Sequence, residues 1–228
     1  MQHHRNLRIP DTLADACDPD RMALVVYDMQ VGVVGQLAHG PQVTERVMRV
    51  LDAARRAGVR VFFTRHMTLP TELMGISQLR TAMAWQRKDR VEEIVSPLLR
   101  DSPDFELLPE LAPRESEAVF DKLSMSAFEG TPLEFALRDV QVTAFAIVGV
   151  ATEVGIEPTV RHGADRGLIP VVVTDACGAG DPSAAKRSLG ALATAGDAIL
   201  TDIPTITGLL AQATTSDPRQ AAQEVSNA

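Results

Sequence analysis

The stretch TAFAIVGVATEVGIEPTVRHGADRGLIPVVVT, residues 143–174, contains the pattern that decides the fold. Residues 143–150 and 169–174 are apolar runs of the length and composition of buried strands. Between them, apolar residues recur at helical spacing from 156 to 164, and Gly167 follows as a stop signal. A strand, a helix and a strand with short links predict two parallel strands joined by a right-handed crossover.

The same alternation extends along most of the chain. Further strands are predicted at residues 22–27, 59–64, 118–120 and 198–201, and helices at 44–57, 132–138 and 183–195. The strand runs are nearly continuous in apolar residues, which is typical of parallel strands buried on both faces. We therefore predict one α/β domain, residues 1–213, with three α/β/α layers and a doubly wound, mostly parallel sheet of about six strands.

Two segments depart from this alternation. Leu69 to Leu111 has weak strand signals and contains a predicted helical stretch from Gln78 to Leu99, which includes Trp85, the only tryptophan. An insertion of this kind between core strands commonly forms a lid or a subunit contact. Residues 214–228 are polar, and we expect them to form a disordered tail.

Composition limits the possible functions. The net charge of -8 argues against nucleic acid as a partner, because phosphate binding needs a basic face. Two cysteines are too few for a disulfide framework and fit a reducing compartment. The sequence has neither an apolar run of membrane-spanning length nor the apolar core of a signal peptide. We expect a cytoplasmic protein that binds a small molecule and no membrane.

In an open parallel sheet, ligands bind beyond the carboxyl ends of the strands. Polar or reactive residues follow four of the predicted strands: Asp28, Lys122, Thr152 with Glu153, and Asp175 with Cys177. Asp28 and Lys122 form a suggestive pair. The lysine would favour the charged carboxylate and burial would oppose it, and spacing leaves open which effect prevails. An aspartate after a strand is also a common turn former.

Three motifs then resemble one family. LVVYDMQ (24–30), FDKLSMSAFEGTPLEFAL (120–137) and VGVATEVGIEPTVRHGADRGLIPVVVTDACG (148–178) are similar to those of isochorismatase-like hydrolases, also called cysteine hydrolases. The resemblance implies a Rossmann-like isochorismatase fold. Most members use an aspartate, a lysine and a cysteine as catalytic triad. Asp28 and Lys122 match the first two, and Gly155 stands at the third position.

The resemblance implies a reaction without a thiol. Amidohydrolases of the family need the thiolate, whereas its isochorismatases carry glycine there and cleave a vinyl ether by acid catalysis and water addition. We therefore favour isochorismate-type cleavage, with Asp28 as general acid/base, Lys122 positioning it, and no cofactor or metal. The alternatives are a small-amide C–N hydrolase that uses activated water, and an inactive metabolite-binding or subunit protein.

The family also implies a cis peptide bond between Val150 and Ala151, homodimers or larger homo-oligomers, and an oxyanion hole. The amides of Ala151 and Gly155 would form that hole in a pocket-facing turn that includes Thr152. Candidate substrate contacts are Gln30, His66, Trp85, Phe128 and Glu153. Glu153 could instead be an acidic residue at a helix start, where the positive end of the helix dipole stabilises it. The stretch 78–99 is the candidate subunit interface.

Other reactive residues are explained more simply. Cys177 could be a displaced nucleophile, but a free cysteine is more often a small buried hydrophobe, and Cys17 is predicted to be inert. GAG at 178–180 lacks the glycine spacing of a nucleotide-binding loop. The histidines do not cluster at metal-ligand spacing.

Overall fold

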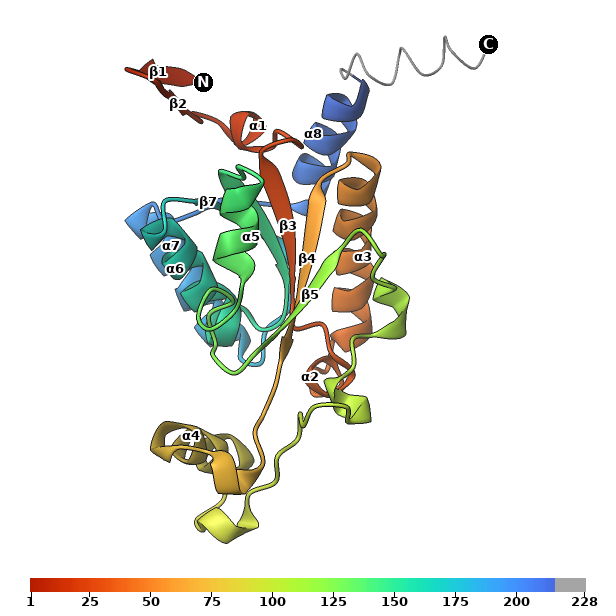
Figure 1. Ribbon diagram of the computed structural model, residues 1–228, viewed down its shortest axis with the longest axis vertical. Helices are drawn as coiled ribbons and strands as arrows, with labels where there is room; N and C mark the ends of the chain where they lie inside the picture. The colour runs from red at the N-terminus through yellow and green to blue at the C-terminus, as the bar shows by residue number, and fades with distance from the viewer. Residues whose placement is uncertain (216–228) are drawn as a thin grey trace.

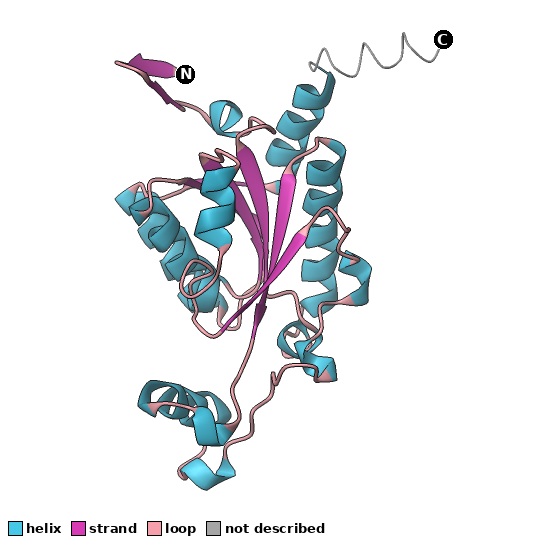
Figure 2. Ribbon diagram, viewed as in Figure 1, coloured by secondary structure: helices cyan, strands magenta, loops and turns pink. Residues whose placement is uncertain are grey.

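The computed structural model describes residues 1–215 and contains a central sheet with helices on both faces (Figures 1 and 2). The sheet has six strands in the order β5-β4-β3-β6-β7-β8, and every neighbouring pair is parallel. The strands are β3 (Met22–Tyr27), β4 (Arg60–His66), β5 (Ala118–Lys122), β6 (Ala144–Gly149), β7 (Ile169–Cys177) and β8 (Ile199–Thr201). This confirms the predicted doubly wound, parallel sheet.

Helices complete the three layers. One face of the sheet packs against α3 (Gly40–Arg56) and α8 (Ile203–Thr215), through a core that includes Val47, Leu51 and Ile206. The other face packs against α5 (Leu133–Asp139), α6 (Glu157–Asp165) and α7 (Pro182–Ala195), which bury residues such as Leu137, Val160 and Leu192. The two hydrophobic cores explain why the central strands β3 and β6 are buried along their whole length.

The ends of the chain contain elements that were not predicted. The helix α8 ends at Thr215, and residues 216–228, which make up most of the predicted polar tail, lie outside the described part of the chain. The sequence analysis also did not predict the short N-terminal hairpin. The remaining elements are β1 (Gln2–His4), β2 (Leu7–Ile9), α1 (Leu13–Ala16), α2 (Val31–Val34) and 3-10 turns at Thr71–Leu73, Val91–Glu93, Pro103–Phe105 and Pro109–Leu111. No helix within residues 1–215 has the length and apolarity to cross a bilayer.

Strand order reverses between β3 and β6. The chain enters the sheet at β3, adds β4 and β5 on one side, and returns to place β6 on the other. Tyr27 pairs with Gly149, so the segments that follow these strands leave the sheet side by side. Gly149 has φ +123°, and a Cβ there would overlap the Tyr27 backbone, so only glycine permits this close approach.

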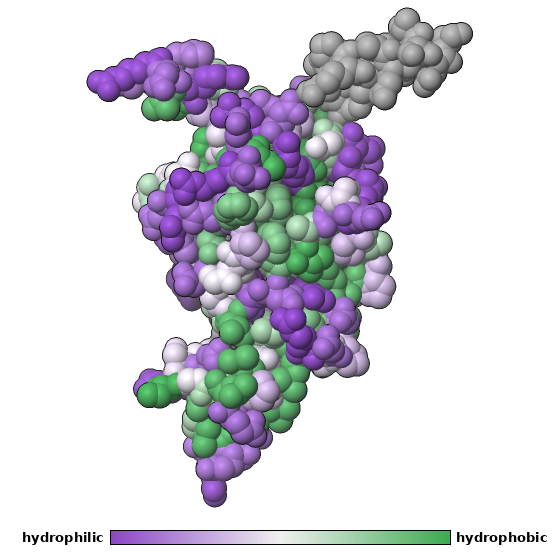
Figure 3. All heavy atoms as spheres, viewed as in Figure 1, coloured by the Kyte–Doolittle hydropathy of each residue, from purple (hydrophilic) through white to green (hydrophobic). Residues whose placement is uncertain are grey.

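Residues 69–99 form an arm between β4 and β5. Figure 1 shows its helix α4 (Ile76–Gln86) standing apart from the three layers. The predicted helix 78–99 is wrong in its second half, because Arg87 adopts φ 52° and ends α4 with a left-handed cap. The helix α4 buries none of its residues, and Figure 3 shows hydrophobic side chains on the arm surface.

Candidate active site

An ion pair lies at the carboxyl end of the sheet. Lys122 Nζ donates a hydrogen bond to Asp28 Oδ2 at 2.7 Å. The lysine side chain is fully buried and the aspartate side chain is 6% exposed. Asp28 follows β3 and Lys122 ends β5, with β4 between them, so the lysine reaches across a strand. The structure thus brings together the two residues that the sequence analysis paired.

Thr64 on the neighbouring strand β4 holds Asp28 in place through hydrogen bonds. Its hydroxyl donates to Asp28 Oδ1 at 2.6 Å, and its carbonyl and hydroxyl oxygens accept from the Asp28 backbone N–H at 3.2 Å each. Asp28 adopts φ 47°, a left-handed conformation that aspartate tolerates better than most residues. The two carboxylate oxygens therefore have different partners, one a hydroxyl and the other an ammonium group.

Burial also changes the pKa of Lys122. It lowers the pKa of Lys122 from its usual value, while the neighbouring Asp28 carboxylate opposes that decrease. Lys122 Nζ also donates to the carbonyl of Ser124 at 3.1 Å and lies 4.4 Å from the centroid of the Tyr27 ring. The ammonium group is thus surrounded by a carboxylate, a carbonyl and an aromatic face, all of which favour a cation.

His66 lies beside this pair. It ends β4 and pairs in register with Lys122. Burial, followed by the positive charge of Lys122, lowers the pKa of His66 to about 4. At neutral pH the imidazole is therefore uncharged, and its Nδ1 is a buried polar atom without a partner in the described chain.

The side-chain amide of Gln30, a predicted substrate contact, is hydrogen-bonded to the protein itself. It is fully buried, and its Nε2 donates to the carbonyls of His66 at 3.0 Å and Phe105 at 2.7 Å. Its Oε1 accepts from the backbone N–H of His66 at 2.6 Å. Both polar atoms of the amide are engaged in joining the end of β4 to the segment around Phe105.

The turn after β6 contains the residues for which an oxyanion hole was predicted. The Val150–Ala151 peptide bond is cis, and a π turn (Thr152–Ile156) leads into α6. The Gly155 N–H donates to the Ala151 carbonyl at 3.0 Å, so it has an acceptor within the turn, and its part in an oxyanion hole stays a prediction. The Ala151 N–H, by contrast, has no acceptor in residues 1–215. Thr152 is buried, and both its N–H and its hydroxyl donate to the Gly178 carbonyl at 2.9 Å.

Gly155 was expected to face an open pocket, but the space next to it is occupied. A Cβ at this position would overlap the hydroxyl group and ring of Tyr27. Tyr27 is 1% exposed, and its hydroxyl donates to the carbonyl of Met125. Burial and the nearby Asp28 carboxylate raise the pKa of Tyr27 well above its ordinary value, so this hydroxyl stays protonated. The aromatic side chain fills the space beside the glycine.

Glu153 contacts the loop before α7. Its Oε1 accepts from the backbone N–H groups of Gly180 at 2.8 Å and Asp181 at 2.7 Å. Its Oε2 is buried without a partner among the described residues. The carboxylate therefore joins the π turn to the 178–181 loop.

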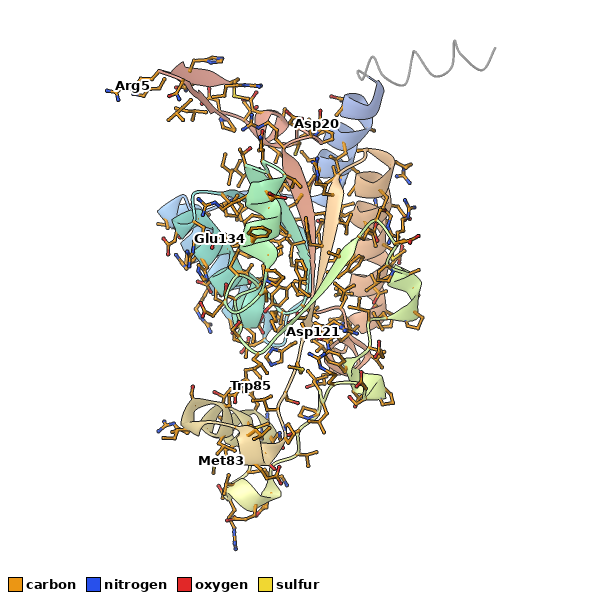
Figure 4. All side chains as sticks on the ribbon, in the orientation of Figure 1. Arg5, Asp20, Met83, Trp85, Asp121 and Glu134 are labelled. Atoms are coloured by element: carbon orange, nitrogen blue, oxygen red, sulfur yellow. The ribbon has the colours of Figure 1, made fainter. Side chains whose placement is uncertain are left out.

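Phe128 and Trp85 have very different surroundings. Phe128 is 5% exposed and packs edge-on against Phe145 with ring centroids 5.5 Å apart, which places it in the core beneath α6. Trp85 lies on α4 and is 59% exposed. Figure 4 shows it on the arm, apart from Asp121 at the end of β5. The roles of Phe128 and Trp85 as substrate contacts stay predictions.

The cysteines are not activated. Burial raises the pKa of Cys17 to about 11 and that of Cys177 to about 12. Cys177 Sγ donates to the carbonyl of Ile147 at 3.7 Å. Among residues 1–215, no three histidine, cysteine, aspartate or glutamate side chains are arranged to hold a metal ion.

Sequence reasoning missed Tyr27 and Thr64 as parts of this site. Tyr27 was assigned to a buried strand, and Thr64 was the last residue of another. One signal was available for Tyr27, because it is the only aromatic residue in an otherwise aliphatic strand, directly before the candidate aspartate. No comparable local signal distinguishes Thr64, whose role depends on the pairing of β3 with β4.

The site geometry and strand order can be compared with known proteins. The profile of the isochorismatase domain matches residues 22–203, which includes the whole sheet and every residue of the site. The chain belongs to the isochorismatase family. The resemblance carried by the three sequence motifs therefore named the correct family, and the chain is a hydrolase.

Individual relatives are similar over most of their length. The chain is 32% identical over 188 residues to ureidoacrylate amidohydrolase RutB of Methylorubrum extorquens, covering 75% of each chain. It is 28% identical over 174 residues to the protein of the same description from Acinetobacter baylyi, covering 70% of this chain and 71% of the other. The crystal structure of a cysteine hydrolase from Pseudomonas syringae pv. phaseolicola superposes with a TM-score of 0.71 at 26% identity, covering 86% of this chain and 94% of that one.

Proposed function

We propose that this hydrolase cleaves the C–N bond of a small amide or ureide with a water molecule that Asp28 activates. The observation that carries the proposal is the Lys122–Asp28 hydrogen bond of 2.7 Å beside a residue, Gly155, that has no nucleophilic side chain. In this proposal Gly155 stands where cysteine-dependent relatives carry their thiol. The similarity to proteins described as ureidoacrylate amidohydrolases supports an amide or ureide as substrate.

The proposed reaction needs no covalent adduct. Asp28 takes a proton from water while the water oxygen forms a bond to the substrate carbonyl carbon. The Ala151 N–H and the Lys122 ammonium group would stabilise the oxyanion that develops on the carbonyl oxygen. When the C–N bond breaks, Asp28 returns the proton to the leaving nitrogen, which gives an acid and an amine or ammonia. His66 Nδ1, neutral and unpartnered, would accept a hydrogen bond from a substrate N–H.

The comparisons favour this reaction over isochorismate-type cleavage, which the sequence analysis preferred. Both sequence relatives named above are described as ureidoacrylate amidohydrolases. The amide alternative is therefore better supported than the original main hypothesis. General acid/base chemistry at Asp28 is common to both reactions, so the aspartate alone does not distinguish them.

A substrate panel tests the proposal. Linear ureides, ureidoacrylate among them, small amides and isochorismate would be incubated with the protein while ammonia release and vinyl-ether cleavage are measured. We expect ammonia release from a ureide or amide, and a decrease of about 10²–10⁴-fold in kcat for Asp28→Asn. Asp139→Asn, an exposed aspartate on α5, is the matched control and should keep full activity. Vinyl-ether cleavage without ammonia release would contradict the proposal.

Assembly and location are part of the same proposal. We propose that the chain forms a homodimer or larger homo-oligomer through the arm, residues 69–99. Its exposed hydrophobic side chains include Leu73 (67%), Ile76 (83%), Trp85 (59%) and Val95 (67%). An exposed apolar surface on a projecting segment is a common mark of a protein interface. A cytoplasmic location stays a prediction from cysteine usage.

A further inference from the structure

Two residues from different elements of the fold compete for one volume in the site. Gly155 lies in the π turn after β6, and Tyr27 is the last residue of β3. The atoms nearest to a Cβ built on Gly155 are the hydroxyl oxygen, Cζ and Cε1 of Tyr27, all closer than real Cβ contacts permit. Not every glycine of the helical layers is crowded in this way. Gly190 in α7 has no atom within 4 Å of its would-be Cβ.

The tyrosine side chain is held in this position by several contacts. Its hydroxyl donates to the Met125 carbonyl, and its ring lies under the Lys122 ammonium group at 4.4 Å. On the other side, Thr159 Oγ1 donates to the Gly155 carbonyl at 2.7 Å and fixes the turn. Neither residue can therefore move aside without breaking hydrogen bonds that are buried from water.

We propose that Tyr27 and Gly155 are a matched pair, in which the tyrosine occupies the volume that a nucleophilic side chain at position 155 would need. Two residues, rather than one, then determine that the site works without a covalent adduct at this position. Glycine provides no nucleophile, and Tyr27 prevents one from being added by a single substitution. The steric part of this inference stands on the structure alone, whereas its chemical consequence rests on the proposed function.

A double-mutant cycle on stability tests the steric part. Gly155→Ala should lower the Tm by roughly 3–10 °C, the range expected for overpacking a chain of this size. In a Tyr27→Leu background, which removes the outer ring and hydroxyl, the same substitution should cost less than about half as much. Gly190→Ala is the control and should not lower the Tm in either background. Equal Tm losses from Gly155→Ala in both backgrounds would overturn the pairing.

A smaller change at Tyr27 provides the same test if the Tyr27→Leu variant fails to fold. Tyr27→Phe removes only the hydroxyl oxygen, the atom nearest to the would-be Cβ, and keeps the ring. The Tyr27→Phe/Gly155→Ala variant should be more stable than additivity of the single changes predicts, by a smaller margin than the leucine pair. A double variant that is additive or worse would count against the inference in the same way.

Thiol labelling tests the chemical consequence. Iodoacetamide labelling at neutral pH, read by mass spectrometry, would compare Gly155→Cys with Tyr27→Leu/Gly155→Cys. We expect residue 155 to label about tenfold faster in the double variant, because the new thiol gains room at a helix start near Lys122. Equal labelling in both variants would overturn the claim that Tyr27 blocks the position. Neither readout uses turnover, so a failure of the proposed amide hydrolysis would leave both results interpretable.

Discussion

Lys122 and Asp28 are joined across β4 by a hydrogen bond of 2.7 Å that water scarcely reaches. Their strands, β5 and β3, are not neighbours, so both side chains must extend over the end of β4 to meet. Thr64 and His66 at that end support the aspartate and flank the lysine. Because each charge is removed from solvent, each depends on the other for compensation.

The first prediction concerns this dependence. Asp28→Asn and Lys122→Met should each lower the free energy of unfolding by about 3–5 kcal/mol, since each leaves a buried charge without its partner. The double variant should cost less than the sum of the two, by at least about 2 kcal/mol. Urea unfolding gives the three values.

The exposed pair Glu134–Arg138 provides the control cycle. It lies on α5, and the arginine side chain is 72% exposed. Its coupling should not exceed about 0.5 kcal/mol, the usual range for an exposed helical pair. A coupling of the same size for both pairs would show that burial does not strengthen the dependence between Asp28 and Lys122.

A second prediction concerns the thiols. Cys17→Ala/Cys177→Ala should retain turnover within about twofold, and iodoacetamide at neutral pH should not inhibit the wild-type protein. The reason is that burial keeps both thiol pKa values well above neutral, so little thiolate is present. Enzyme assays before and after alkylation would measure this. Loss of turnover in step with labelling of Cys177 would indicate a displaced nucleophile instead.

A third prediction follows from the pKa of His66, which is about 4 in the folded chain and near 6.5 when unfolded. Between these values the unfolded chain binds a proton that the folded chain does not. The free energy of unfolding should therefore fall as pH decreases from 6.5 towards 4, by up to about 1.4 kcal/mol per pH unit from this residue.

Substitution isolates that contribution. His66→Asn should have a shallower pH dependence of stability over this window, measured by urea unfolding at half-unit pH steps. His39→Asn, at an exposed position before α3, should keep the wild-type dependence. If both variants follow the wild-type curve, the imidazole of His66 is not shielded from protons in the folded state.

The fourth prediction concerns the arm. If residues 69–99 mediate self-association, Ile76→Glu/Val95→Glu should shift the mass in solution from an oligomer to the 24.6 kDa monomer. Light scattering at micromolar concentration measures the mass directly. Phe135→Glu is the matched control, because Phe135 is 73% exposed but lies on α5, outside the arm. A monomeric wild-type protein, or dissociation by the control alone, would contradict the proposed interface.

Local sequence determined the sheet and most of its helices. Predicted strand and helix positions agree closely with the structure, because apolar periodicity and stop signals act over a few neighbouring residues. The stretch 143–174 contained a complete strand–helix–strand unit, and parallel topology placed Asp28 and Lys122 at one edge. The N-terminal hairpin and α8 were missed, since short exposed strands and a threonine-rich helix give weak local patterns.

Tertiary structure alone decided what each candidate side chain touches. Gln30 and Glu153 looked available to a ligand, but their partners come from segments 75 and 28 residues away in sequence. Gly155 was expected to face a pocket, whereas Tyr27 at the end of β3 fills its side-chain space. Periodicity reports which face of an element is buried, but not which distant atom occupies a given volume. That volume is shared only after β3 and β6 have paired, so close packing in the folded chain determines the chemistry open to residue 155.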